Sequence, residues 1–176
     1  IWIQMLPDIT VVAVVLLLCF ALLYIGIQHF RLNRLNEQLA FDEAFYRSVF
    51  WQAPMGISIS EDTMHANRPE FGDMTINQAY ASIVGRGEDE LRQMSWAEIT
   101  HPDDLAEDLD NYTRFKNGEI NGYSMEKRFV RPDGSVVWTH LTVSPLLGMH
   151  TDHLVHICQI IDITSQKEAE TALIES

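Results

Sequence analysis

A run of 19 consecutive uncharged residues, Ile9 to Ile27, most constrains how this chain folds. At about 1.5 Å per residue a helix of this length reaches roughly 28 Å, close to the hydrocarbon thickness of a bilayer. A buried core helix is the alternative, but a soluble domain of this size rarely surrounds a helix that is apolar on every side. A signal peptide would carry a basic segment before the run, and there is none. The sequence therefore predicts a transmembrane helix over residues 9–29.

The charges that flank this run predict its orientation. Asp8 precedes it, whereas Arg31 and Arg34 follow it closely. Positive residues are retained on the cytoplasmic side, so we expect the span in the inner (cytoplasmic) membrane with the C-terminal part in the cytoplasm. Residues 1–8 would then form an extracytoplasmic flank. Because the chain begins without Met, we expect that a longer segment precedes it.

Charge and cysteine content narrow the classes of function. The formal net charge is −13, from 12 Lys and Arg against 25 Asp and Glu. All 12 basic residues and 24 of the acidic ones lie after residue 30. No cluster of them forms a basic patch that could neutralise phosphates, which argues against nucleic-acid binding. Cys19 lies in the apolar run and Cys158 in a strand-like segment, so we expect two separate buried thiols and no disulfide framework.

Residues 30–49 are expected to form a helical signalling linker. Apolar side chains recur near heptad spacing over about two and a half heptads, with Asp42 interrupting the pattern. These side chains are Leu32, Leu35, Leu39, Tyr46 and Val49. Two interpretations stay open. The helix could pair with a second copy as a parallel homodimer, or it could pack as an amphipathic helix on its own domain.

The remaining sequence predicts one α+β domain over residues 50–164, followed by a connector helix over residues 165–176. Alternating runs indicate strands, and caps and glycines delimit short helices, with a long polar loop over residues 61–70. The expected strands are Gly56–Ser60, Phe71–Ile76, Tyr123–Arg131, Ser135–Pro145 and His153–Ile163, and the expected helices are Asn77–Val84, Glu88–Met94, Trp96–Thr100 and Asp103–Lys116. This order predicts a five-stranded antiparallel sheet with flanking helices.

Four short motifs follow one another in the second half of the chain. Pro102 suits the first turn of a helix, where an N–H would be unpaired, and Asp103 and Asp104 suit the positive end of its dipole. The motif residues are His101 to Asp104, Glu126 with Arg128, Asp133-Gly134 with Trp138, and Asp162 to Thr164. In this order they resemble the PAS sensory fold, in the variety with an HPDD helix start, an E-x-R strand, a D-G turn and the closing D-I-T of the PAC motif. The resemblance covers about residues 42–165.

The PAS resemblance implies that polar residues on the central strands anchor the D-I-T segment. Asp162 would end the last strand and couple it to the following helix. The expected signal-coupling residues are Asp162, Ile163, Thr164, Glu126, Arg128 and Trp138. Glu126 and Arg128 lie two residues apart on one strand face, so the alternative is an exposed charge pair that contributes little.

Catalysis and the common cofactors are disfavoured. The sequence has no Gly-rich phosphate loop and no nucleophile elbow, so this fragment is not expected to be an enzyme. Domains that resemble this one hold haem, flavin or small acids between sheet and helices, and a small-molecule ligand of unknown identity is therefore an expected partner. Flavin is disfavoured because residues 89–100 lack the Cys of light-sensing relatives. Haem is disfavoured because residues 103–116 lack an axial His.

Three residues, His153, His156 and Cys158, are candidates for a metal site, since imidazole and thiolate bind zinc well. On a strand, His156 and Cys158 share one face, whereas His153 and His156 point to opposite faces. Ordinary strand and turn residues are therefore favoured, and no metal is predicted.

Together these features predict a membrane-anchored sensory or relay module of a bacterial-type receptor. It would pass a ligand or membrane signal through helical linkers to an output domain beyond Ser176. Domains that resemble this one and end in D-I-T commonly precede a cyclic-di-GMP cyclase or phosphodiesterase, a histidine kinase of a two-component system, or another PAS copy. The alternative is a ligand-free dimerisation and transmission module with no small-molecule site.

Overall fold

The computed structural model describes residues 9–62, 74–146 and 154–174. The chain divides into two compact units, Ile1–Ser48 and Val49–Ser176. The first unit contains most of helix α1 (Ile9–Gln52), in which the apolar run and the predicted linker form one unbroken helix of 44 residues. The helix is long and apolar enough to cross a membrane, judged by length and composition alone, and none of its most apolar stretch is buried.

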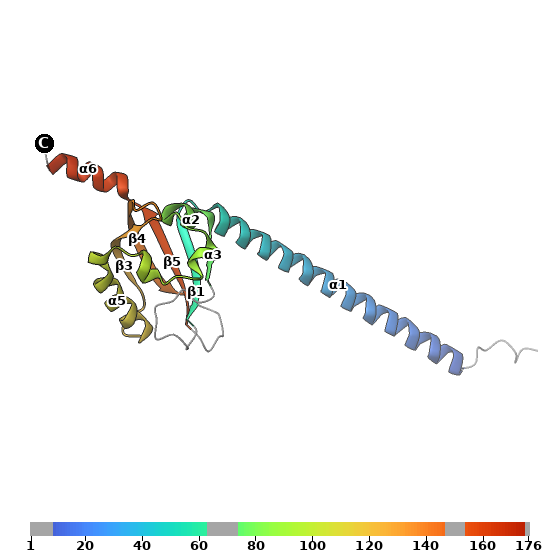
Figure 1. The fold of residues 1–176 in the computed structure, drawn as a ribbon. Helices are drawn as coiled ribbons and strands as arrows, with labels where there is room; N and C mark the ends of the chain where they lie inside the picture. Colours follow the sequence, from blue (N-terminus) through green and yellow to red (C-terminus); the bar gives the residue numbers. More distant parts are fainter. Residues whose placement is uncertain (1–8, 63–73, 147–153, 175–176) are drawn as a thin grey trace, which may run out of the picture. The chain divides into compact units, whose positions relative to one another are not determined.

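The second unit is built on an antiparallel sheet of five strands in the order β2-β1-β5-β4-β3 (Figure 1). The strands are β1 (Gly56–Asp62), β2 (Met74–Ile76), β3 (Tyr123–Val130), β4 (Val136–Pro145) and β5 (Leu154–Asp162). This arrangement confirms the predicted fold class. The prediction of a loop from residue 61 was wrong at its start, because Glu61 and Asp62 continue β1 and pair with Val155 and Leu154. The rest of that loop, and the first residues of the predicted second strand, lie outside the described residues.

Four helices connect β2 to β3, and one helix follows β5. They are α2 (Gln78–Val84), α3 (Glu88–Leu91), α4 (Trp96–Ile99), α5 (Pro102–Lys116) and α6 (Thr164–Ile174). Their starts follow from local sequence. Ser95 and Glu98 form a reciprocal capping box at α4, and the His101 side chain accepts a hydrogen bond from the backbone N–H of Asp103 at α5. Helix α3 ends at Leu91, earlier than the predicted Met94.

The hydrophobic core lies between the sheet and helices α2 to α5. Alternate residues of β3 and β4 point into it, as the two-residue period of a strand requires. Helix α2 contributes Tyr80 and Val84, and α5 contributes Phe115. The other buried members are Met74, Ile76, Leu91, Ile99, Met125, Phe129, Val137, Leu141, Val143 and Ile160. The opposite face of β3 and β4 is therefore free to carry polar side chains.

Asn77 joins three elements at one end of the domain. Its side-chain oxygen accepts hydrogen bonds from the N–H groups of Ile57 and Tyr80, each at 2.9 Å. Its amide nitrogen donates to the carbonyls of Phe50 at 3.0 Å and Met55 at 2.9 Å. Asn77 is fully buried, so one side chain pairs the last turn of α1, strand β1 and the first turn of α2.

Candidate functional site

The predicted coupling residues Glu126, Arg128 and Trp138 lie side by side on the face of the sheet that points away from the core. Strands β3 and β4 pair Arg128 with Trp138 in register. The guanidinium of Arg128 lies over the Trp138 ring, with 4.9 Å between its central carbon and the ring centroid. A cation over an indole face at this distance is attracted by the ring quadrupole. The structure therefore brings these three residues together at the edge where helix α6 begins.

The D-I-T residues attach the start of α6 to strand β4. The Thr164 hydroxyl accepts a hydrogen bond from the Trp138 N–H at 3.1 Å, and the Ile163 N–H donates to the Trp138 carbonyl at 2.9 Å. Asp162 accepts from the Thr164 N–H at 2.9 Å, which orders the turn between strand and helix. All six predicted coupling residues thus meet at one junction, which we call the α6 junction.

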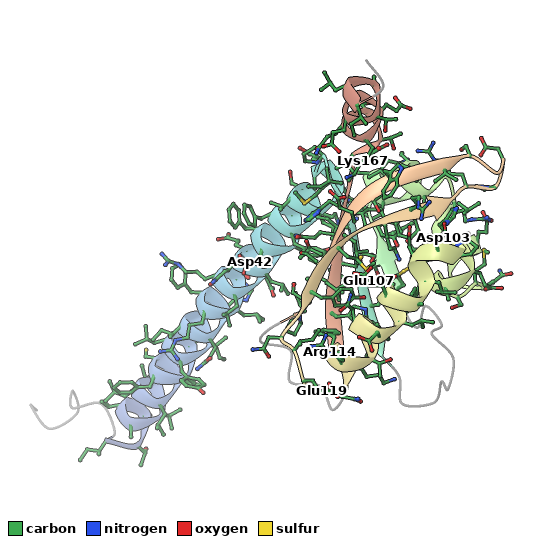
Figure 2. The ribbon with its side chains drawn as sticks, turned by 90° about the vertical axis from the view of Figure 1, so that its left-hand side faces the viewer. Asp42, Asp103, Glu107, Arg114, Glu119 and Lys167 are labelled. Carbon is green, nitrogen blue, oxygen red and sulfur yellow. The ribbon has the colours of Figure 1, made fainter. Side chains whose placement is uncertain are left out.

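Lys167 belongs to the α6 junction and was not predicted. Its ammonium lies 2.6 Å from a Glu126 carboxylate oxygen and 5.6 Å from the centroid of the Trp138 ring. The positive end of the helix dipole disfavours a basic residue in the first turn of a helix, and this is a sequence signal that Lys167 pairs with a carboxylate. Figure 2 labels Lys167 at the base of α6.

Arg128 connects the α6 junction to the beginning of α5. Its guanidinium donates to both carboxylate oxygens of Asp104, at 2.9 and 2.6 Å, and to Asp103 at 3.3 Å. The backbone N–H of Arg128 also donates to Asp104, at 2.7 Å. The alternative of a Glu126–Arg128 charge pair was therefore wrong, because Glu126 pairs with Lys167 and Arg128 pairs with helix α5. In Figure 2, Asp103 and Arg114 mark the two ends of that helix.

The charges at this contact reinforce each other. Partial burial raises the pKa of Asp104, but the hydrogen bonds and positive charge of Arg128 outweigh it and lower the pKa below its ordinary value. Hydrogen bonding to Asp104 in turn raises the pKa of Arg128. The chain of contacts from α5 through Arg128 and Trp138 to Lys167 is therefore held by charged groups at neutral pH.

We expect this contact to make domain stability depend on pH in the acid range. A carboxyl whose folded pKa is lowered contributes stability above its unfolded pKa of about 3.9, and this is lost as pH falls through the folded pKa. Acid unfolding monitored by circular dichroism should therefore show a smaller loss between about pH 5 and 3 for Asp104→Asn than for the wild type. At pH 7, Asp104→Asn should cost about 1–2 kcal/mol of unfolding free energy.

The matched control is Glu107→Gln, at an exposed position of the same helix. It should retain the wild-type pH profile and change the stability at pH 7 by less than about 0.5 kcal/mol. An Asp104→Asn variant with the wild-type profile would show that Arg128 does not hold this carboxylate in solution.

Arg131 contacts both helix α2 and Asp162 at the end of strand β5. Its Nε donates to the carbonyl of Ile83 near the end of α2 at 2.9 Å, and its terminal nitrogen lies 4.0 Å from an Asp162 carboxylate oxygen. From the sequence, Arg131 is expected at the end of the strand Tyr123–Arg131, and no partner is predicted for its side chain. The structure places it between helix α2 and the end of strand β5.

An ion pair lies inside the domain, on the opposite face of β3. The Lys127 ammonium is 2.5 Å from an Asp108 carboxylate oxygen, with both side chains at most 3% exposed. The Tyr123 hydroxyl donates to the other Asp108 oxygen at 2.9 Å. Sequence reasoning missed this pair, although Lys127 alternates with the core residues Met125 and Phe129, which predicts an inward side chain.

The metal candidates do not assemble into a site in the described part of the chain. His153 lies outside the described residues, whereas the His156 ring packs against Tyr112 and Phe115 of α5. Burial raises the pKa of the Cys158 thiol to about 12, so the thiolate that binds metals is scarce at neutral pH. Within residues 9–62, 74–146 and 154–174, no three His, Cys, Asp or Glu side chains are placed to hold a metal ion.

The five-stranded antiparallel sheet with its flanking helices gives the second unit the architecture of a PAS domain. Residues 73–157 match the family described as the PAS fold. The solved PAS domain of an HTR-like protein from Haloarcula marismortui has a TM-score of 0.54 and 16% identity, covering 74% of this chain and 99% of that one. This likeness shows the shared fold.

Two longer curated proteins are similar in sequence. The chain is 43% identical over 99 residues to the probable diguanylate cyclase DgcE of Escherichia coli (strain K12), covering 55% of this chain and 9% of that protein. It is 28% identical over 144 residues to the sensor histidine kinase TmoS of Ectopseudomonas mendocina, covering 81% of this chain and 14% of that protein. The second unit is therefore a PAS sensory domain homologous to those of diguanylate cyclases and sensor histidine kinases.

Proposed function

We propose that this chain is the membrane-anchored PAS module of a signalling receptor and relays a signal to an output domain through helix α6. The observation that carries the proposal is the α6 junction. There the first turn of α6 is bound to β4 through Thr164 and to β3 through Lys167, and Arg128 extends the contacts to α5. A shift of α5 or of the sheet would therefore change the position of α6.

The membrane anchor is the second part of the proposal. Helix α1 has the length and composition of a membrane span, and Arg31 and Arg34 directly after the apolar run favour a cytoplasmic PAS domain. The receptor would lie in the inner membrane, with the lipid bilayer as a partner. The exposed apolar side chains Leu32, Leu35 and Leu39 support a homodimer formed through α1.

The output domain is proposed by analogy with the two relatives. A diguanylate cyclase, a cyclic-di-GMP phosphodiesterase or a histidine kinase would fit, because each is controlled through the geometry of a dimer. The catalytic activity would belong to that domain and not to residues 1–176. A ligand-free transmission module is the second candidate, and the buried Lys127–Asp108 pair inside the domain favours it.

The relay predicts that output depends on the rotation of α6. One residue inserted directly after Glu168 turns the rest of the helix by about 100°, whereas seven residues add nearly two full turns. In the full-length receptor, the single insertion should change the output activity severalfold, and the seven-residue insertion should restore most of it. The measurement is cyclic-di-GMP formation or autophosphorylation, whichever the output domain catalyses.

A four-residue insertion, which adds about 400° and so leaves a rotation of roughly 40°, serves as an intermediate control. The output should follow the rotation and not the added length. If output declines steadily with the number of inserted residues, helical rotation does not carry the signal and the relay through α6 is refuted.

A further inference from the structure

The Lys127 ammonium lies among groups of the kind that proteins use to bind a cationic amine. The Asp108 carboxylate accepts at 2.5 Å and the Thr100 hydroxyl at 3.0 Å. The ammonium lies 4.4 Å from the centroid of the Phe129 ring and 5.2 Å from that of Trp96. A carboxylate, a hydroxyl and two aromatic faces thus surround one positive charge.

All of these groups are buried except Trp96, which is half-buried. Lys127 is 2% exposed, Asp108 1%, Thr100 4% and Phe129 1%. An ammonium in such surroundings is costly unless it is paired and hydrogen-bonded, and here both conditions are met. Ring faces attract cations more strongly when the cation is desolvated, which favours a positive charge at this position over a neutral group.

The groups come from separate parts of the fold. Asp108 lies on α5, Trp96 on α4 and Phe129 on β3, and Thr100 directly follows α4. The site therefore exists only in the folded domain, between the sheet and the helices. Strand β3 supplies Lys127 itself, whose four-carbon side chain extends into the site from the sheet.

We propose that the interior of the domain contains a binding site for a primary ammonium group and that Lys127 occupies it as an internal ligand. Truncation of Lys127 would open the site to a short primary alkylamine. In the intact chain the site is filled, so an amine from solution does not act there. The proposal rests on the side-chain geometry alone and does not depend on the relay through α6.

The test is rescue of Lys127→Ala by propylammonium, which replaces the three methylenes and the ammonium removed by the substitution. The complete chain is solubilised in detergent, and its melting temperature is measured by differential scanning fluorimetry. Lys127→Ala should melt below the wild type. Propylammonium at tenfold its dissociation constant should raise the melting temperature of this variant by about 3–6 °C, with a saturable dose response.

Three controls define the site. Propylammonium should not shift the wild type, in which Lys127 fills the site, nor Lys127→Ala/Asp108→Asn, which lacks the carboxylate. 1-Propanol, which matches the length but carries no charge, should not rescue Lys127→Ala. Equal shifts in the wild type and Lys127→Ala, or equal rescue by 1-propanol, would overturn the proposal.

If Lys127→Ala does not fold alone, the yield of folded chain after refolding with propylammonium or with 1-propanol replaces the melting temperature. The proposal requires a higher yield with propylammonium. Equal yields with the two compounds, or no folded chain with either, would refute it.

Discussion

Replacement of Lys127 by Met should lower the free energy of unfolding by about 3–5 kcal/mol. Met fills a similar volume, so the loss comes from the charge of Asp108, which would stay buried beside Tyr123 without its ammonium partner. The measurement is urea denaturation of the detergent-solubilised chain, followed by tryptophan fluorescence. The effect is large because neither side chain can turn to water, both being at most 3% exposed.

A double-mutant cycle separates the ion pair from general packing. In Lys127→Met/Asp108→Asn the charge is gone and the Asn oxygen still accepts from the Tyr123 hydroxyl, so most of the stability should return. The matched surface control is Arg92→Met, which breaks the exposed pair with Glu88 on α3 and should cost less than about 1 kcal/mol. If the losses of unfolding free energy in Lys127→Met and Asp108→Asn add up in the double variant, the two side chains are not energetically coupled.

Asn77→Ala is expected to have the second-largest effect, a loss of about 2–4 kcal/mol. The variant removes the helix cap of α2, worth about 0.5–2 kcal/mol. It also leaves the buried backbone groups of Phe50 and Ile57, and the partly buried carbonyl of Met55, without their partner. The same denaturation experiment measures the loss. Because Phe50 lies in the last turn of α1, amide hydrogen exchange at residues 50–57 should also accelerate.

Asn77→Ser is the informative control. A serine hydroxyl can cap α2 by accepting from the N–H of Tyr80, but it is too short to reach the Phe50 and Met55 carbonyls. This variant should therefore recover only about 1 kcal/mol of the loss. Wild-type stability of Asn77→Ser would mean that the side-chain bonds across to α1 and β1 contribute nothing.

Much of the fold could be predicted because its signals are local. The turn before Gly134, the cap at Ser95 and the proline at the start of α5 each act within a few residues. The predicted element bounds therefore differ from the structure by at most three residues where the structure describes them. The three-residue difference is at α3, and β1 extends two residues into the predicted loop at residues 61–70. The assignment of the coupling role to the α6 junction stays a prediction.

The sequence by itself determined the long apolar helix, the order of the elements and the residue faces of each strand, because these depend on periodicity and short-range sterics. Only the tertiary structure decided which charges meet. Arg128 pairs with Asp104, which lies 24 residues earlier in the chain, and Lys127 pairs with Asp108, which lies 19 residues earlier. Because side chains alternate along a strand, Lys127 and Arg128 point to opposite faces of β3. The packing of α5 on the sheet decides which carboxylate each of them binds. Such pairs depend on the packing of distant elements, which no local pattern encodes.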